Sequence, residues 1–458
     1  LLLAAAMAFC LAAPALAATP SFSDISDPEL REEVDILRML GVVGGDNNGN
    51  FNPDGTLTRA EMCKLVCLAL NGGREPVIGV KDVPTFKDID GHWAEAYIEY
   101  CYANGIIGGD GSGNFNPNGV LTGVAAAKMM LTAMNYDGTI FGFGGNDWEL
   151  NVGVQANQAE LYEGIEYISP SQPITRDNAA QLVYNAIQAP TMDISWGINP
   201  STGEYTQNYD RNGPSLLADT FNVDVVVGVV TRTETGTLTG TLAAEGKTVL
   251  NLRSINDADA SGTRTYNVST DDSLLGYEVK LLVKNTNAAP VFGSAIVTEK
   301  NNAVVITESV NTVNALTDIL ADAGITAVNA EAVTNGDGGK TVIGQDENHN
   351  DVYGNTTYAS ISALYSANEL GNGKVVAVID NDDDDTAEYI LITDKEVGKV
   401  AAYNTQDKGY ISVTGLSDAN KTFSSADPNS ATNPVIGFGN VAKDDIVLFY
   451  QNAKGNWV

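Results

Sequence analysis

The sequence predicts a multidomain chain, with all-α repeats in its N-terminal part and β-rich modules with one α/β insertion in the rest. Two observations predict this fold class. In the first 190 residues, a set of short motifs recurs at a constant offset, with helical apolar spacing around each copy. Beyond that point, short runs rich in Val, Ile and Thr alternate with Gly, Asn and Asp turns, which is typical of strands.

The N-terminal motifs form two copies of one unit, and matching residues lie 64 positions apart, as 22 does from 86. A weaker third copy ends in residues 173–187, where Thr175-Arg176 matches Thr58-Arg59, but it has no Gly-Asp loop. The matching pairs of the first two copies are Phe22 and Phe86, Asp24 and Asp88, Gly45 and Gly109, Asp46 and Asp110, Phe51 and Phe115, Pro53 and Pro117, and Leu57 and Leu121.

Each copy is expected to fold as a helix, a glycine loop and a second helix. In the first copy, an apolar stripe over residues 30–40 predicts the first helix. Thr58 and Glu61 form the Thr-x-x-Glu capping box that opens the second helix. In the second copy, residues 96–103 and 125–133 take the same two places.

The glycine loop looks at first like a calcium loop, but its spacing excludes an EF-hand. With Asp46 as position 1, such a loop requires glycine at position 6 and glutamate at position 12, where this chain has Phe51 and Leu57. The glycines and Pro53 are therefore expected to shape a turn that leads into the capped helix.

Arg59 is the unexpected residue of this segment, because a cation in the first turn of a helix opposes the helix dipole. A guanidinium fork beside free helix N–H groups can hold a carboxylate or a phosphate at two points. Arg59 and Arg176 are therefore candidate anion-binding residues, with a surface Arg paired to a nearby carboxylate as the alternative. Gly123 occupies this position in the second copy and cannot do the same.

Charge and the first residues limit the classes of function. The formal net charge of −33 and the pI of about 4.1 argue against nucleic acid or an anionic membrane surface as partners. The uncharged residues 1–17 end in Ala15-Leu16-Ala17 and predict a secretory signal peptide, so the mature chain is expected outside the cell. No later stretch is long and apolar enough to insert into a membrane.

Three cysteines are expected to remain after cleavage: Cys63, Cys67 and Cys101. Their odd number argues against a disulfide framework, and the chain has only two histidines to complete a zinc site. We expect them to be small buried apolar residues.

In the C-terminal part, strand-like runs surround one predicted helix at residues 311–324. The segments that begin at Val227-Gly228 and at Val397-Gly398 resemble each other, which predicts two small β modules, sandwich-like or barrel-like. The last of these stops where the return strand of a hairpin would begin, so we expect it to be incomplete.

An acidic run over residues 380–388 places Asp380, Asp382 and Asp384 at alternate positions between two strands. A solvated acidic turn is the favoured interpretation, because charge runs usually face solvent, and a calcium site is the alternative. No metal or cofactor is otherwise expected. No motif for a catalytic serine or a metalloprotease is present, and no carboxylate pair stands out.

The combined motifs resemble the S-layer homology family over about residues 20–190. The resemblance rests on the Phe-x-Asp-Ile-x-Gly-His-Trp-Ala stretch from Phe86, the Gly-Asp loops, the Asn-Phe-x-Pro motif and Thr-Arg-Ala-Glu at residues 58–61. It implies three copies packed as a pseudo-threefold helical spindle that binds an acidic, often pyruvylated, secondary cell wall polymer without a covalent bond. The residues that it implies for glycan binding are Arg59, Arg176, Asp24, Asp88, Trp93, Gly44, Gly45, Gly108 and Gly109.

Some of these residues have a structural alternative that the sequence leaves open. Two roles suit Trp93 equally well: anchoring its helix in the core, and stacking on a ligand. For Asp24 and Asp88, capping the first helix of each repeat is somewhat favoured over contacting a ligand.

The sequence therefore predicts a secreted bacterial protein located at the cell wall or S-layer, not an enzyme, with a structural role that can include self-assembly. The rivals are a wall-tethered glycan hydrolase with its catalytic domain beyond residue 458, and a surface adhesin. The expected parts are a signal peptide (1–17), three repeats (18–75, 76–140 and a degenerate 141–190), a linker (191–220), a β module (221–310), an α/β segment (311–395) and a second β module (396–458).

Overall fold

The computed structural model of the chain describes residues 22–46, 48–76, 83–165, 168, 172–198, 201, 203–285, 291–338, 341–345, 351–371, 373–404, 410–415, 420–425, 434–435, 442–455 and 458. The predicted signal peptide lies outside these residues. The chain divides into two compact units. We call them the helical unit (Leu16–Val225 with Leu282–Ala288) and the β-rich unit (Val226–Leu281 with Ala289–Val458). Within the described residues, every helix is too short or too polar to cross a bilayer.

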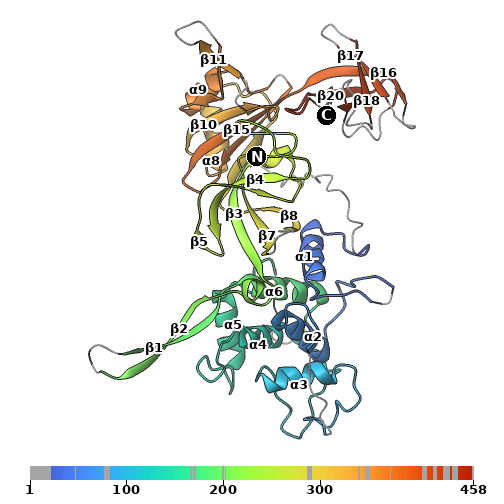
Figure 1. Cartoon of the computed structure of the whole chain (residues 1–458), viewed down its shortest axis with the longest axis vertical. Helices are drawn as coiled ribbons and strands as arrows, with labels where there is room; N and C mark the ends of the chain where they lie inside the picture. The colour runs from blue at the N-terminus through green and yellow to red at the C-terminus, as the bar shows by residue number, and fades with distance from the viewer. Residues whose placement is uncertain are drawn as a thin grey trace. The chain divides into compact units, whose positions relative to one another are not determined.

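The helical unit consists of helix pairs, one pair for each predicted repeat (Figure 1). The second helix of each pair begins directly after a threonine: Thr58, Thr122 or Thr175. This confirms the helices expected in the first two copies and the second helix of the degenerate third. The bounds are α1 Pro28–Met39, α2 Arg59–Leu70, α3 Glu95–Ala103, α4 Gly123–Ala133, α5 Trp148–Gln158 and α6 Arg176–Gln188.

The predicted capping box is confirmed at the start of α2. The Glu61 N–H donates to Thr58 Oγ1 at 3.3 Å, and the Thr58 N–H donates to Glu61 Oε2 at 2.8 Å. In the second copy, Thr122 Oγ1 accepts from the Ala125 N–H at 3.3 Å. The local sequence thus fixes where these helices begin, since each cap satisfies N–H groups that have no partner within the helix.

The three helix starts meet through a closed ring of backbone hydrogen bonds. The Leu57 N–H donates to Ile174 O at 3.0 Å, the Ile174 N–H to Leu121 O at 2.8 Å, and the Leu121 N–H to Leu57 O at 3.1 Å. All three side chains are buried. Each repeat therefore completes the backbone hydrogen bonding of another, and the degenerate third copy is part of the ring.

The predicted burial of the cysteines is confirmed. Cys63, Cys67 and Cys101 are fully buried, and Cys67 Sγ lies 3.8 Å from Cys101 Sγ, between α2 and α3. A hydrogen bond with Cys101, together with burial, raises the pKa of the Cys63 thiol.

Much of the expected linker is structured: β1 (Thr191–Ile198) and β2 (Tyr205–Gly213) pair as an antiparallel hairpin. In Figure 1 this hairpin projects away from the helices of its own unit. The polar composition suggested a linker, but apolar Ile194, Trp196 and Ile198 alternate with polar or small residues, and this alternation is the signal of a strand. The short helix α7 (Leu216–Asp219) follows the hairpin.

The described residues of the β-rich unit form three main sheets and a small hairpin, and the strands agree well with the predicted runs. The first sheet has the order β5-β4-β3-β7-β8, with β6 paired to β4. Its strands are β3 Val223–Arg232, β4 Thr248–Ile255, β5 Ala258–Asp259, β6 Thr263–Tyr266, β7 Glu278–Lys284 and β8 Val291–Val297, with a 3₁₀ turn at Asp272–Leu274.

The second sheet has the order β13-β10-β15-β14-β9, and β10 runs parallel to β15. Helix α8 (Val313–Asp322) confirms the helix predicted at 311–324, and its residues Leu316 and Leu320 join the buried core of this sheet. The strands are β9 Asn302–Ile306, β10 Ala327–Thr334, β13 Thr356–Tyr358, β14 Lys374–Asp380 and β15 Thr386–Asp394. Helix α9 spans Ile361–Ser366, and the hairpin is β11 Thr341–Gln345 with β12 Asp351–Gly354. Strand β9 comes from the segment assigned to the preceding module.

The third sheet has the order β19-β18-β17-β16-β20, with bounds Glu396–Asn404 (β16), Tyr410–Gly415 (β17), Asn420–Ser425 (β18), Pro434–Val435 (β19) and Ile446–Phe449 (β20). The predicted likeness of the first and last modules has a counterpart in their hydrogen bonds. Val230 exchanges backbone hydrogen bonds with Gly276 and Tyr277, as Val400 does with Asp444 and Asp445. Closure of either module into a sandwich or barrel stays a prediction.

Candidate functional site

Each Gly-Asp loop of the helical unit is organised by its own aspartate. Asp46 Oδ1 accepts the N–H groups of Asn48 at 2.8 Å and Asn50 at 2.9 Å. Asp110 holds the second loop in the same way. Hydrogen bonds from the Asn50 and Asn48 backbone lower the pKa of the Asp46 carboxyl. In a calcium loop such a carboxylate binds the ion. Here it accepts hydrogen bonds from N–H groups of its own turn.

Asp24 and Asp88 hold the other side of each loop. The N–H groups of Phe51 and Asn52 donate to Asp24 at 2.9 and 2.6 Å. Asp88 accepts the equivalent pair at 2.8 and 2.7 Å. Capping of the first helix is therefore the wrong structural interpretation for these two residues, because both oxygens bind N–H groups 27 and 28 positions further along the chain.

Arg59 extends from the start of α2 into the loop of the second repeat. Its Nε donates to Phe115 O at 3.0 Å and its Nη2 to Gly108 O at 3.4 Å, while the guanidinium carbon lies 4.4 Å from the centre of the Phe115 ring. Burial lowers the pKa of this guanidinium. The contacts explain how a cation is accommodated at a helix start, since two carbonyl oxygens and an aromatic face compensate its charge.

Arg176 makes the same contacts with the loop of the first repeat. Its Nε donates to Phe51 O at 2.8 Å, its Nη2 to Gly44 O at 3.4 Å, and its guanidinium lies 5.0 Å from the Phe51 ring centre. Both arginines are therefore connectors between repeats. A guanidinium has five N–H donors. The two bonds to carbonyls leave donors for a ligand.

At the start of α4, the position equivalent to Arg59 and Arg176 is occupied by Gly123. A Cβ atom at Gly123 would lie 2.7 Å from Ile168 Cγ2, so the Ile168 side chain takes the space beside the start of α4. This supports the expectation that the second copy lacks the arginine's role, and it gives a steric reason that the sequence did not reveal.

A groove of about 400 Å³ lies beside Arg176 and brings four of the predicted residues together. Gly44, Gly45, Trp93 and Arg176 line it, along with Lys64, which the sequence analysis missed. Trp93 is 56% exposed, so the core-anchor alternative for it is wrong. Repeat alignment could have identified Lys64, because Lys128 stands 64 positions later at the same place in α4.

The remaining predicted residues lie elsewhere in the helical unit. Gly108 and Gly109 belong to the loop of the second repeat, which Arg59 reaches from the start of α2. Asp24 and Asp88 accept hydrogen bonds from the Phe-Asn-Pro turns of the two loops. The structure therefore distributes the predicted set over two similar loops, and the groove lies at the first.

Gly44 and Gly45 of the first loop differ in how much space a side chain would have. A Cβ at Gly45 would lie 2.6 Å from Phe22 Cε1 and 3.0 Å from Asn50 O, whereas a Cβ at Gly44 would meet nothing within 4 Å. Because the Phe22 ring is buried, we expect Gly45→Ala to lower the unfolding free energy by about 1–3 kcal/mol. Gly44→Ala is the matched control, with a change below about 0.5 kcal/mol in the same urea titration. Equal effects of the two variants would contradict this account.

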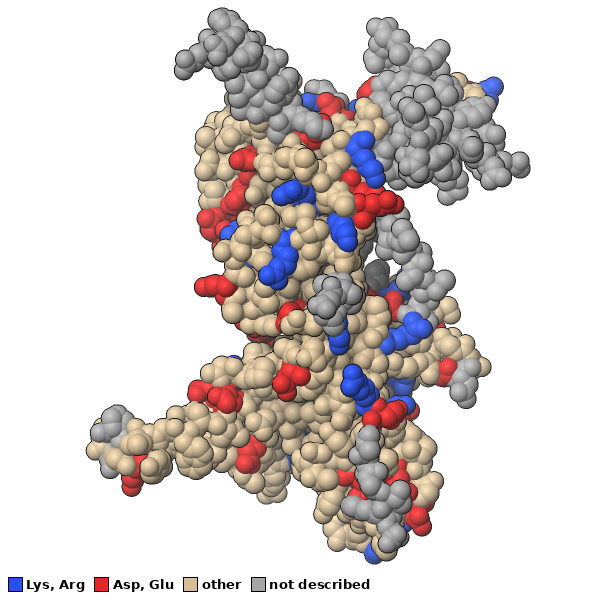
Figure 2. Space-filling view, in the orientation of Figure 1, with Lys and Arg blue, Asp and Glu red and all other residues tan. Residues whose placement is uncertain are grey.

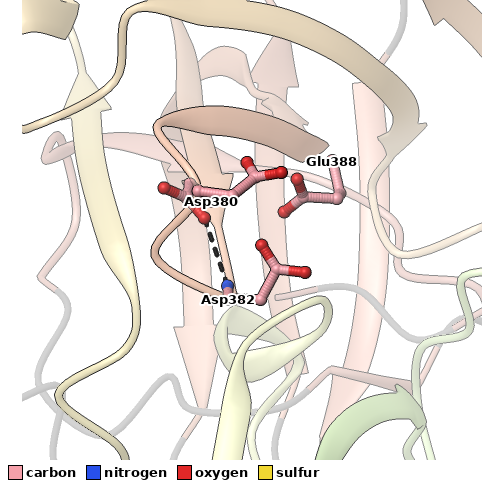
Figure 3. Close-up of side chains that lie close together, drawn as sticks. Asp380, Asp382 and Glu388 are labelled. Carbon is pink, nitrogen blue, oxygen red and sulfur yellow. Dashed lines mark hydrogen bonds between the residues drawn. The ribbon is translucent and has the colours of Figure 1, made fainter.

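The acidic turn of the β-rich unit gathers four carboxylates. One oxygen each of Asp380, Asp382, Asp384 and Glu388 lies within 4.8 Å of the others, and Figure 3 shows the first, second and last of them facing one another. The buried Asp380 accepts N–H groups of its own turn, at 3.1 Å from Asp382 and 3.0 Å from Asp383. The solvated turn and the calcium site both stay predictions.

Glu388 gives this turn a pH dependence. Burial and the negative charges of Asp382, Asp380 and Asp384 raise its pKa from 4.5 to about 7. Between these values the folded form binds the proton more tightly than the unfolded form, so this contribution to stability is full below pH 4.5 and is lost as the pH rises through about 7.

We therefore expect Glu388→Gln to raise the thermal midpoint of the β-rich unit at pH 8 and to leave it nearly unchanged at pH 4. Calorimetry at the two pH values measures this. Asp322→Asn, which removes an exposed charge at the end of α8, serves as the control. A gain of equal size at both pH values would rule out the titration of Glu388 as its cause.

Comparison with known proteins identifies the first two helical repeats. Residues 21–63 and 85–127 match the S-layer homology domain family. An S-layer protein of Bacillus thuringiensis subsp. finitimus is 30% identical over 191 residues, which is 39% of this chain and 23% of that protein. An uncharacterized cell wall amidase of Bacillus anthracis is 32% identical over 127 residues (28% and 23%), and the exoglucanase XynX of Acetivibrio thermocellus is 29% identical over 187 residues (37% and 16%).

The chain thus spans less than a quarter of the length of these relatives. It carries two S-layer homology domains, and the proteins that it resembles include an S-layer protein and a protein named as a cell wall amidase.

Proposed function

We propose that the helical unit anchors an exported bacterial protein to the cell wall by binding an acidic secondary wall polymer without a covalent bond. The rest of the chain then serves as a structural part of the S-layer or envelope, where copies can assemble. The observation that carries the proposal is the groove beside Arg176, in which a guanidinium, the Lys64 ammonium and the exposed Trp93 ring line one space with an open glycine.

The chemistry of the groove suits a sugar that bears a carboxylate, such as a pyruvylated one. Arg176 is held in place by two carbonyl oxygens, so its remaining N–H donors are oriented before a ligand arrives. Trp93 offers an apolar face for a sugar ring, and the absence of a side chain at Gly44 leaves room against the loop. Asp46 also lines the groove, but it uses its oxygens on its own loop.

The ring of hydrogen bonds among Leu57, Leu121 and Ile174 supports a pseudo-threefold spindle. In such an arrangement the degenerate third repeat has a purpose, because it supplies Arg176 to the loop of the first repeat. We propose two arginine-bearing positions, at Arg176 and Arg59, and a third that Ile168 closes.

A second candidate is a wall-tethered enzyme. It is favoured by the matches to proteins named as an amidase and an exoglucanase, which are similar to this chain over less than half of its length. Release of soluble sugars or peptides from sacculi by the complete protein would support this candidate.

Sedimentation with purified wall sacculi tests the anchor. We expect the mature chain to bind intact sacculi, to lose most of that binding after acid extraction of the secondary polymer, and to be displaced by the released soluble polymer. Binding that is unchanged by extraction and unaffected by soluble polymer would refute the proposal.

A further inference from the structure

The hairpin of β1 and β2 is fixed to the helical unit at its base. Arg211 Nε donates to Tyr136 Oη at 3.1 Å, and its Nη2 donates to Gln155 Oε1 at 3.0 Å and also to Gln158. The Met192 N–H donates to Met134 O at 2.9 Å. An isolated two-stranded hairpin is marginally stable in water. These contacts hold the base, while among the described strands none pairs with the distal half.

The register gives the hairpin two different faces. Residues that lie directly opposite each other share a face, and the next pair along points to the other side. One face carries the pairs Ile194 with Tyr209, Trp196 with Gln207, and Ile198 with Tyr205. The opposite face carries Asp193 with Asp210, Ser195 with Asn208, and Gly197 with Thr206.

The first of these faces, which we call the aromatic face, is packed at its base and open further out. Tyr209 contacts the Phe141 ring at 6.0 Å between ring centres. Trp196, Ile198 and Tyr205 are 69%, 60% and 76% exposed. Large apolar side chains that are exposed together in this way mark an interaction surface.

The size of the aromatic face argues against a folded protein as its partner. From Ile194 to Ile198 it is roughly 14 Å long and two strands, roughly 10 Å, wide. That area is far below the approximately 800 Å² per partner of a stable protein–protein interface. The narrow strip fits a single slender polymer strand.

Charge narrows the class of polymer. Residues 191–213 contain Asp193, Glu204 and Asp210, and their single cation, Arg211, is used at the base. Outside the grey atoms, the visible surface of the projecting hairpin in Figure 2 is uncharged apart from patches of acidic atoms. An anionic strand is disfavoured there, so the aromatic face and the groove beside Arg176 differ in the ligand that they suit.

We propose that the aromatic face binds the uncharged glycan strands of the same wall, with Trp196 and Tyr205 stacking on the apolar faces of pyranose rings and Gln207 bonding to their hydroxyl or amide groups. This inference rests on the proposed function in that it places the chain at the wall. It assigns a second kind of glycan contact, to a different ligand from that of the groove.

The test uses the full chain and sacculi from which the acidic polymer has been extracted. The variant is Trp196→Ala with Tyr205→Ala, and its matched control is Thr206→Ala with Asn208→Ala, on the opposite face of the same hairpin. We expect the wild type and the control to bind the extracted sacculi alike and a soluble N-acetylglucosamine hexamer to compete. The aromatic variant should need at least about tenfold more sacculi for half-saturation.

Equal binding by the aromatic variant and the wild type overturns the proposal, as does a wild type that does not bind extracted sacculi. If the variant changes only self-association in analytical ultracentrifugation, the partner is a second copy and the proposal is wrong. Binding of released acidic polymer is measured separately with the same variants. The aromatic variant should bind soluble acidic polymer normally. A failure of the proposed anchor would therefore appear in the polymer measurement, and a failure of the proposed hairpin contact only in the measurement with extracted sacculi.

Discussion

Replacing Arg176 by alanine is expected to weaken the binding of soluble acidic wall polymer about 30-fold or more. Loss of one partner from a hydrogen-bonded charge contact that excludes water costs about 2 kcal/mol or more, which corresponds to about 30-fold in affinity. Isothermal titration of the full chain with polymer released from sacculi measures the effect. Arg176→Lys should recover part of the affinity, because it restores the charge without the fork.

Arg59→Ala is expected to have the smaller effect of the two. Its guanidinium contacts the second loop in the same way, but the groove that contains Trp93 and Lys64 lies beside Arg176. Arg264→Ala, an exposed charge on β6 of the β-rich unit, is the control and should bind as the wild type does. If Arg176→Ala kept full affinity while remaining folded, the groove would not be the binding site.

The boundaries of the helices could be predicted from the sequence because their signals are local. Thr58 and Glu61 lie within one turn of each other, so a capping box can be recognised from four residues. The strands of the β-rich unit were equally accessible, since apolar runs between turn residues are local as well. The hairpin of β1 and β2 is harder to predict: Ile194, Trp196 and Ile198 alternate as in a strand, but the many polar and turn residues around them are equally typical of a linker.

The roles of the arginines could be predicted only in part. The sequence shows an unusual cation at a helix start. Its carbonyl partner is distant, however: Gly108 lies 49 residues from Arg59, and Gly44 lies 132 residues from Arg176. No local pattern indicates which loop an arginine will reach. The same limit applies to Ile168, which closes the position at Gly123, and to Asp24, whose hydrogen bonds reach the turn at Phe51.

The loops serve the fold and the site at once, and Phe51→Ala is expected to show this. The Phe51 ring is 2% exposed and packs against Phe22, with 5.6 Å between ring centres. Its N–H bonds to Asp24 and its carbonyl oxygen to Arg176. Removal of a buried aromatic ring costs about 3–5 kcal/mol, so the urea midpoint of the helical unit should fall strongly, as followed by circular dichroism.

Phe115→Ala is the matched variant, because Phe115 is equally buried and has the same relation to Arg59 and Asp88. We expect a similar loss of stability from the two variants but different losses of affinity when polymer binding is measured well below their unfolding midpoints. Phe51→Ala removes the ring beneath Arg176 and should weaken binding about tenfold, while Phe115→Ala should leave the groove at Arg176 intact. Equal losses of affinity would mean that the two loops bind polymer equally, and that the groove at the first loop has no special part in holding the wall.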